Sequence, residues 1–156
     1  MAALLRQPTR MQENEVYQAI GEDGFHRLTA AFYRQIPGDG ILGPMYSRGD
    51  LTGAEQRLRE FLIFRFGGPP RYIENRGHPR LRMRHAPFAI SLGARDRWML
   101  LMTRAIEEVS LTAEASRMLL DFFSSTATFL VNRTDEGGDP TASPRSAGPP
   151  DRPALP

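Results

Sequence analysis

Apolar residues recur every three or four positions in four stretches of this 156-residue chain. Such spacing places them along one face of a helix. The predicted helices cover about residues 25–36, 51–66, 95–109 and 112–130. The first ends before Pro37-Gly38 and the second at Gly67-Gly68-Pro69-Pro70, because proline and glycine end helices, and Thr112 is a candidate N-cap of the last. No β-hairpin signal accompanies them, so the sequence predicts an all-α fold.

The two ends of the chain differ in composition from this helical part. Residues 134–156 are rich in Pro, Gly, Ser and Asp and have almost nothing apolar to bury, a composition typical of disorder. Residues 1–14 are predicted to be a flexible leader. The folded domain is therefore expected at residues 15–133.

Composition excludes several classes of site. The chain has no cysteine, so disulfides, iron–sulfur clusters and thiolate zinc sites are absent. Its histidines are His26, His78 and His85 alone, which suits a cofactor that brings most of its own metal ligands. No apolar run is long enough for a membrane span, and the first residues do not form a secretory signal. We therefore expect a cytoplasmic protein without a membrane partner.

Familiar catalytic motifs are missing or misplaced. Gly38–Gly43 matches the dinucleotide pattern G-x-G-x-x-G, but it follows a helix instead of a strand, so we interpret it as a turn. The chain has no H-E-x-x-H, no G-x-S-x-G and no P-loop. Its net charge of +2 gives no general case for nucleic-acid binding. Catalysis by side chains alone has no support.

The connection over residues 71–92 is long for two neighbouring helices, and such loops are often functional. Five arginines fall within residues 71–84, where Glu74 is the one acidic residue. A short helix would place Leu81, His85, Phe88 and Leu92 on one side. Burial among apolar side chains keeps an imidazole neutral and able to bind a metal. An exposed histidine, or a short strand over residues 80–84, are the alternatives from spacing alone.

The same connection carries a specific resemblance. The residues concerned are Gly67-Gly68-Pro69, Tyr72, Arg76-Gly77-His78-Pro79-Arg80-Leu81-Arg82-Met83-Arg84-His85-Ala86-Pro87-Phe88, Asp96 and Trp98, and upstream Phe32-Tyr33, Tyr46 and the run at 51–58. Over about residues 16–133 the chain resembles the group II truncated haemoglobins. The resemblance implies a truncated globin-like two-over-two helical sandwich around one haem b. A local departure, Gly21-Glu22-Asp23-Gly24 in place of a glycine pair, is expected to alter the start of the first long helix.

The resemblance also implies roles for individual residues. His85 is the expected iron ligand, Tyr72 and Arg84 meet the haem propionates, and His78 lies near that rim. The remaining haem-pocket and distal ligand-binding positions are Tyr33, Tyr46, Ala54, Leu58, Phe61, Leu81, Phe88, Trp98 and Met102. Tyrosine hydroxyls and an indole N–H are hydrogen-bond donors that slow the release of a ligand carrying partial negative charge.

The function expected from these residues is the binding of dioxygen and other small diatomic ligands, with slow release. A haem redox enzyme, acting on nitric oxide or peroxide, is the alternative. An arginine-rich module that binds acidic partners or nucleic acid is a further one. The reductase and the oligomeric state, a homodimer included, are left open by the sequence.

Overall fold

The computed structural model describes residues 10–46 and 49–134, and within these ranges it contains helices and no strand. The elements are the 3-10 helices η1 (Glu13–Glu15) and η2 (Gly43–Met45) and the α-helices α1 (Val16–Gln35), α2 (Leu51–Arg65), α3 (Arg71–Arg76), α4 (Leu81–His85), α5 (Leu92–Val109) and α6 (Ala113–Leu130). The predicted all-α class is confirmed. In the described part of the chain, no helix combines the length and apolar character needed to cross a membrane.

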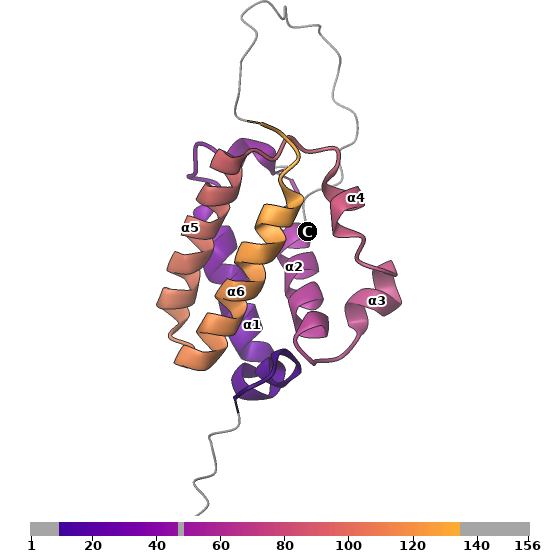
Figure 1. Cartoon of the computed structure of the whole chain (residues 1–156), viewed down its shortest axis with the longest axis vertical. Coiled ribbons are helices and arrows are strands. Elements are labelled where there is room, and N and C mark those ends of the chain that lie inside the picture. Colours follow the sequence, from indigo (N-terminus) through magenta and orange to yellow (C-terminus); the bar gives the residue numbers. More distant parts are fainter. Residues whose placement is uncertain (1–9, 47–48, 135–156) are drawn as a thin grey trace, which may run out of the picture.

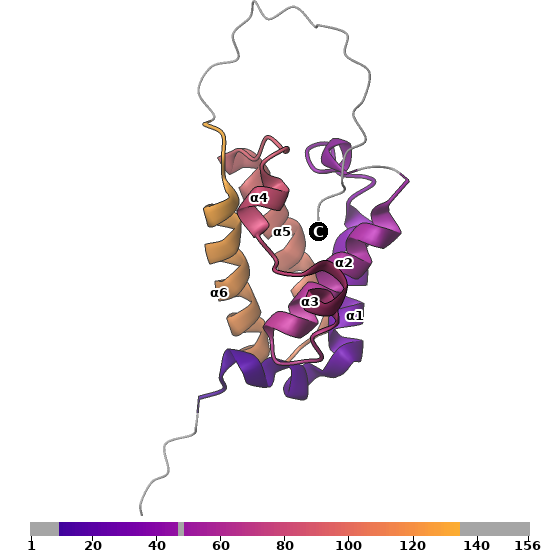
Figure 2. The same ribbon diagram turned by 90° about the vertical axis from the view of Figure 1, so that its right-hand side faces the viewer.

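The four long helices form two pairs, α1 with α2 and α5 with α6, and α1 also packs against α5 (Figure 1). Phe25, Leu28 and Phe32 on α1 are fully buried between them. Burying one such side chain stabilises a fold by about 1.5–3 kcal/mol. Helices α3 and α4 cross between α6 and α2, as Figure 2 shows. They contact α2 and α6 respectively, which leaves room for a pocket behind them.

Helix boundaries differ from the predictions where local signals are weak. Helix α1 begins at Val16, nine residues before the predicted start at Phe25. The run Gly21-Glu22-Asp23-Gly24 interrupts the apolar stripe between Ile20 and Phe25. Gly21 lies inside α1 with φ 68° and ψ 177°, a left-handed angle that favours glycine and kinks the helix. Helix α5 begins three residues earlier than expected, where the Ser91 side chain accepts a hydrogen bond from Ala94 N.

The long connection contains two short helices, so the strand alternative for residues 80–84 is wrong. The predicted four-residue stripe is wrong at its far end. Helix α4 stops at His85, and Leu92 is 52% exposed instead of sharing the buried side. Pro87 explains the break, since proline cannot continue a helix.

The end of α2 is tied closely to the start of α1. Tyr17 N donates to Phe66 O at 3.0 Å, and Gly68 N donates to Ile63 O at 2.7 Å. Gly67 has φ 96°, and a Cβ there would lie 1.9 Å from Asn14 O. The Gly67-Gly68 pair therefore permits a backbone approach that no side chain would allow.

Candidate functional site

A cavity of about 780 Å³, including its open mouth, lies between α2, α4, α5, α6 and the loop after α1. Most of its walls are apolar. The lining residues are Leu42, Met45, Tyr46, Leu58, Phe61, Leu62, Leu81, His85, Ile90, Ala94, Arg95, Trp98, Phe122, Phe123, Thr126, Ala127 and Leu130.

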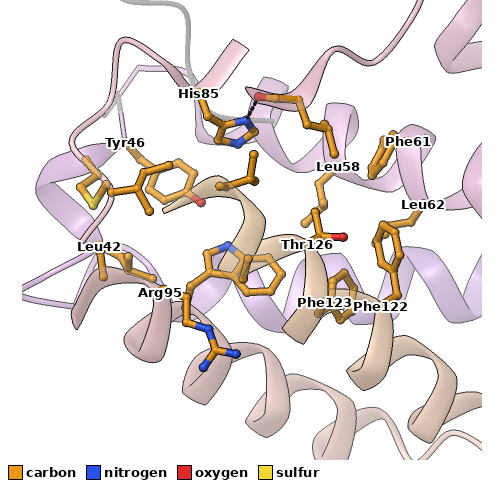
Figure 3. A pocket seen from close by; sticks show the side chains of 17 residues that line it. Leu42, Tyr46, Leu58, Phe61, Leu62, His85, Arg95, Phe122, Phe123 and Thr126 are labelled. Carbon is orange, nitrogen blue, oxygen red and sulfur yellow. Dashed lines mark hydrogen bonds between the residues drawn. The ribbon is translucent and has the colours of Figure 1, made fainter. Parts of the chain in front are cut away.

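His85 is the one imidazole in this lining, and its ring points into the cavity from α4 (Figure 3). The side chain is 8% exposed, and Nδ1 lies 2.7 Å from Leu81 O. A carbonyl oxygen can only accept, so Nδ1 carries the proton and Nε2 has a free lone pair. Burial lowers the pKa of His85 below 6.5, although the hydrogen bond to Leu81 O acts in the opposite direction. The ring is therefore a neutral donor of electrons towards the cavity.

The turn before α4 is held by backbone acceptors. Arg80 has the left-handed angles φ 42° and ψ 51°, and its N–H donates to His78 Nδ1 at 3.1 Å. Arg84 Nε donates to Pro79 O at 2.8 Å, and a terminal nitrogen of its guanidinium donates to Arg76 O at 2.9 Å. Arg84 thus connects the end of α3 to α4. Neither His78, which is exposed, nor Arg84 lines the cavity.

A residue that the sequence analysis missed holds the other end of the same segment. Asn132 Nδ2 donates to Phe88 O at 2.9 Å and to His85 O at 3.4 Å. Its Oδ1 accepts from Ile90 N at 2.9 Å. One amide therefore fastens the chain after His85 to the end of α6. No motif marks Asn132, and a sequence signal for it is lacking.

The opposite wall carries three polar aromatic residues. Tyr46 and Trp98 line the cavity, and Figure 3 shows the Tyr46 hydroxyl directed into it. Tyr33 lies behind, with its ring centroid 5.7 Å from that of Tyr46. Burial raises the pKa of Tyr46 to about 12, while hydrogen bonds from Trp98 and Tyr33 to its oxygen act to lower it. Burial and the neighbouring Tyr46 raise the pKa of Tyr33 well above 10.

This network assigns directions to the protons. A hydroxyl has two lone pairs and one proton. The Tyr46 oxygen accepts from both Trp98 and Tyr33, so its own proton is left to donate into the cavity. The three residues then act as one donor supported by two others.

The loop that carries Tyr46 is anchored by a buried carboxylate, which the sequence analysis also missed. Asp39 is 2% exposed at its side chain, and Oδ1 accepts from Leu42 N at 2.8 Å and Ile41 N at 3.0 Å. Its Oδ2 accepts from Arg97 Nε at 2.5 Å. Burial alone would raise the pKa of Asp39, but these hydrogen bonds lower it below 3.8. The Gly38–Gly43 segment is a turn, as predicted, and Arg97 ties it to α5 beside Trp98.

The remaining predicted residues divide into two groups. Leu58, Phe61 and Leu81 line the cavity. The buried residues that do not line it are Ala54, Phe88, Met102 and Tyr72. The ring of Tyr72 packs edge-on against Phe61 with centroids 5.4 Å apart, and its hydroxyl has no hydrogen-bond partner. Buried hydroxyls are normally paired, so this one suits a polar edge of a group in the cavity.

Five of the eleven lining residues that the sequence analysis missed lie on α6. Phe122, Phe123 and Leu130 fit the helical stripe that the sequence analysis assigned to the core. The sequence signal that this stripe faces a cavity was Thr126, a polar residue four positions after Phe122 and four before Leu130. Arg95 also lines the cavity, yet its guanidinium is bound to α6 through Ser124 Oγ at 2.9 Å and Thr128 Oγ1 at 3.2 Å.

An all-helical sandwich around an apolar cavity, with a buried neutral imidazole on one wall and hydroxyl and indole donors on the other, defines a haem protein of the globin class. The chain belongs to the bacterial-like globin family, whose model matches residues 15–132. It is similar to the group 2 truncated haemoglobin YjbI of Bacillus subtilis, with 37% identity over 122 residues that cover 78% of this chain and 92% of the relative.

Solved structures give the same result. A thermostable haemoglobin from Thermobifida fusca is 44% identical, with a TM-score of 0.72 over 75% of this chain and 96% of that one. A truncated oxygen-avid haemoglobin from Bacillus subtilis is 37% identical, with a TM-score of 0.72 over 75% of this chain and 98% of that one. The resemblance to group II truncated haemoglobins and the two-over-two fold are confirmed. As a globin, the chain binds small ligands through haem.

Proposed function

We propose that this globin holds haem b in the cavity through His85 Nε2 and binds dioxygen, or another diatomic ligand, with slow release. The observation that carries the proposal is the ring of His85. Its Nδ1 proton is committed to Leu81 O, and its Nε2 faces an apolar cavity. Metal-bound histidines commonly use this arrangement, in which the second nitrogen orients the ring.

Each wall of the cavity has a part in this function. When bound, haem supplies an iron with one coordination position for an imidazole and one for a small ligand. Leu58, Phe61 and Phe123 exclude water from the space around it. The absence of cysteine rules out thioether links to the haem, so the non-covalent b type is the form we expect.

The polar residues near α3 and α4 suit the charged edge of haem. Tyr72 has a buried hydroxyl without a partner in the described structure, and a carboxylate would satisfy it. Arg84, and at the exposed rim His78, add positive or polar groups for the two propionates. These roles follow the family pattern and stay proposals.

Tyr46 is the direct donor to the ligand in this proposal. Its proton is free of other partners, and the hydrogen bonds from Trp98 and Tyr33 increase its donor strength. A fixed donor in a dry site stabilises partial negative charge on a ligand and slows its escape. Trp98 also lines the cavity, but its N–H is engaged with Tyr46. The oxygen-avid relative is consistent with slow release.

The redox-enzyme alternative has less support from the cavity. A peroxidase-like reaction needs a group that moves protons near the ligand. In the described lining, His85 is the one imidazole and no carboxylate is present. By the family resemblance, Ala54 occupies the position where other globins place a distal histidine, and its methyl side chain cannot transfer a proton. Ligand binding is the function we favour.

Absorption spectra of the wild-type protein and of histidine variants test the proposal. We expect a Soret band in the wild-type protein, and its loss or marked shift in His85→Ala. His26→Ala, which changes an exposed imidazole on α1, is the matched control and should keep the spectrum. A His85→Ala protein that retains the wild-type spectrum and carbon monoxide binding would contradict the proposal.

A further inference from the structure

The arginines of this protein divide sharply by their partners. Nine described arginines form an ion pair with a carboxylate. The described arginines outside these pairs are Arg10, Arg76, Arg80, Arg82, Arg84, Arg104 and Arg133. Most of this second group surrounds α4, where Glu74 is the nearest acidic residue in sequence. Within residues 10–46 and 49–134, no carboxylate forms an ion pair with these arginines, so this part of the described surface is positively charged.

The outer side of α4 has an apolar centre within this charge. Met83 is 60% exposed and points away from the cavity side of α4, with Arg82 and Arg84 on either side of it in the helix. The guanidinium of Arg82 lies 4.9 Å from the ring centroid of Phe129, which is 56% exposed. Figure 2 shows α4 beside the end of α6 that carries Phe129.

Arg133 joins this surface from the end of α6. Arg82 and Arg133 line a shallow hollow together with Ala86, Leu130 and Asn132. We call Arg80, Arg82, Met83, Phe129 and Arg133 the α4 ridge. Protein interfaces are enriched in arginine, methionine and aromatic residues and depleted in lysine and acidic ones. The ridge has this composition, and its charge selects an acidic partner.

The location of the ridge relates it to the iron site. Met83 lies two residues before His85 on the same short helix, so the ridge is the outer surface of the element that presents the proposed iron ligand. Dioxygen binding needs ferrous iron. The chain has no cysteine, and its described part has no cluster of metal-ligating side chains for a second redox centre. Electrons must therefore come from another molecule.

We infer that the α4 ridge is the docking surface for an acidic electron-carrier protein with a flavin or iron–sulfur centre. This inference rests on the proposed function. One electron leaves the carrier, which is oxidised by one electron, and the haem iron goes from ferric to ferrous with no transfer of atoms. Uncompensated charge steers such a partner and raises its association rate by about 10- to 1,000-fold at low salt.

The test uses an acidic plant-type [2Fe–2S] ferredoxin and a flavodoxin as probes. Their affinities for the globin are measured by fluorescence anisotropy at low and high salt, with and without haem. In Arg82→Glu/Arg133→Glu we expect the affinity for at least one probe to fall about tenfold or more, because reversed charges repel the acidic face. Arg104→Glu/Arg117→Glu, which reverses two charges on α5 and α6, is the matched control and should change it less than twofold.

Two further readouts make the result decisive. Reduction of the ferric protein by the reduced probe, followed by stopped flow, should slow in parallel with binding. The Soret band and carbon monoxide binding of both double variants should stay at wild-type values. Equal losses in the two variants, no binding to either probe, or tighter binding to a DNA duplex than to both carriers would overturn the inference. Failure of haem uptake would instead overturn the proposed function, since anisotropy on the haem-free protein still tests the ridge.

Discussion

The loop after α1 and the segment between α2 and α5 both present one polar side chain to the cavity, but they are held in different ways. Residues 36–46 are held by a buried charge, since Asp39 receives two backbone N–H groups and the Arg97 guanidinium. Residues 71–92 are held mainly by hydrogen bonds to backbone groups, from the Arg84 guanidinium at one end and the Asn132 amide at the other.

This difference indicates at which residues a substitution should destabilise the protein most. A buried carboxylate with an ionic partner is costly to disrupt, because removal of one charge leaves the other without its partner. Hydrogen bonds to backbone carbonyls near the surface contribute less each, since water replaces the lost partner. We therefore expect the Tyr46 side of the cavity to depend on a single residue, and the His85 side on several smaller contributions.

Asp39→Ala should show the largest effect on stability. It removes the acceptor of two backbone N–H groups and leaves Arg97, which is partly exposed, without its ion pair. We expect a loss of about 2–4 kcal/mol in the free energy of unfolding, measured by urea denaturation. Asp96→Ala removes an exposed carboxylate paired with Arg95, and we expect a change below about 1 kcal/mol. Equal losses in the two variants would show that Asp39 is not a special anchor.

Tyr46→Phe tests the function of that anchored loop. Loss of the hydroxyl removes the proposed direct donor, and a hydrogen bond to a charged group contributes about 1.5–3 kcal/mol. The dissociation rate of dioxygen should therefore rise about 10- to 150-fold, as measured by stopped-flow ligand replacement. Tyr33→Phe, which removes only a supporting donor, should raise it less. A larger effect in Tyr33→Phe would reverse the proposed order of donors.

Asn132→Ala tests the opposite segment, with a smaller expected effect. It removes the bonds to Phe88 O and Ile90 N, and we expect a loss of about 1–2 kcal/mol in unfolding free energy. Haem should also transfer faster to an excess of an acceptor apoprotein, because the chain around His85 is less fixed. Asn75→Ala on the exposed side of α3 is the control and should leave both quantities unchanged. A loss as large as that of Asp39→Ala would remove the contrast between the two regions.

The last prediction is a pH dependence that is confined to the alkaline end. The pKa of Tyr46 is about 12 in the folded chain and near 10 when exposed, so the unfolded chain loses this proton first. The stability associated with the protonated hydroxyl is complete below about pH 10 and falls as pH rises towards 12, by about 1.4 kcal/mol per pH unit. Urea denaturation between these pH values measures the slope, which should be shallower in Tyr46→Phe. An unchanged slope would mean that this burial has no thermodynamic effect.

Local patterns were sufficient for most of the four long helices, whereas the role of His85 as candidate iron ligand came from the family resemblance. The stripe Phe25, Leu28 and Phe32 predicts a buried helix face because the helical repeat depends only on neighbours in the chain. The segment around His85 could be singled out because its arginines and prolines are adjacent in sequence. The start of α1 was missed, since Gly21-Glu22-Asp23-Gly24 separates its first turn from the stripe that begins at Phe25.

The sequence by itself determined an all-helical chain with two of its three histidines in an unusual connection, since helix period, capping and turn residues act over a few positions. Only the tertiary structure decided which groups meet around the cavity. Asp39 and Arg97 are 58 positions apart, and Asn132 is 44 positions from Phe88. Such pairs depend on how two helices pack side by side, and hydrogen bonds form only within about 3 Å. That packing also turns Trp98 and Tyr33 towards Tyr46, whose hydroxyl group is directed into the cavity.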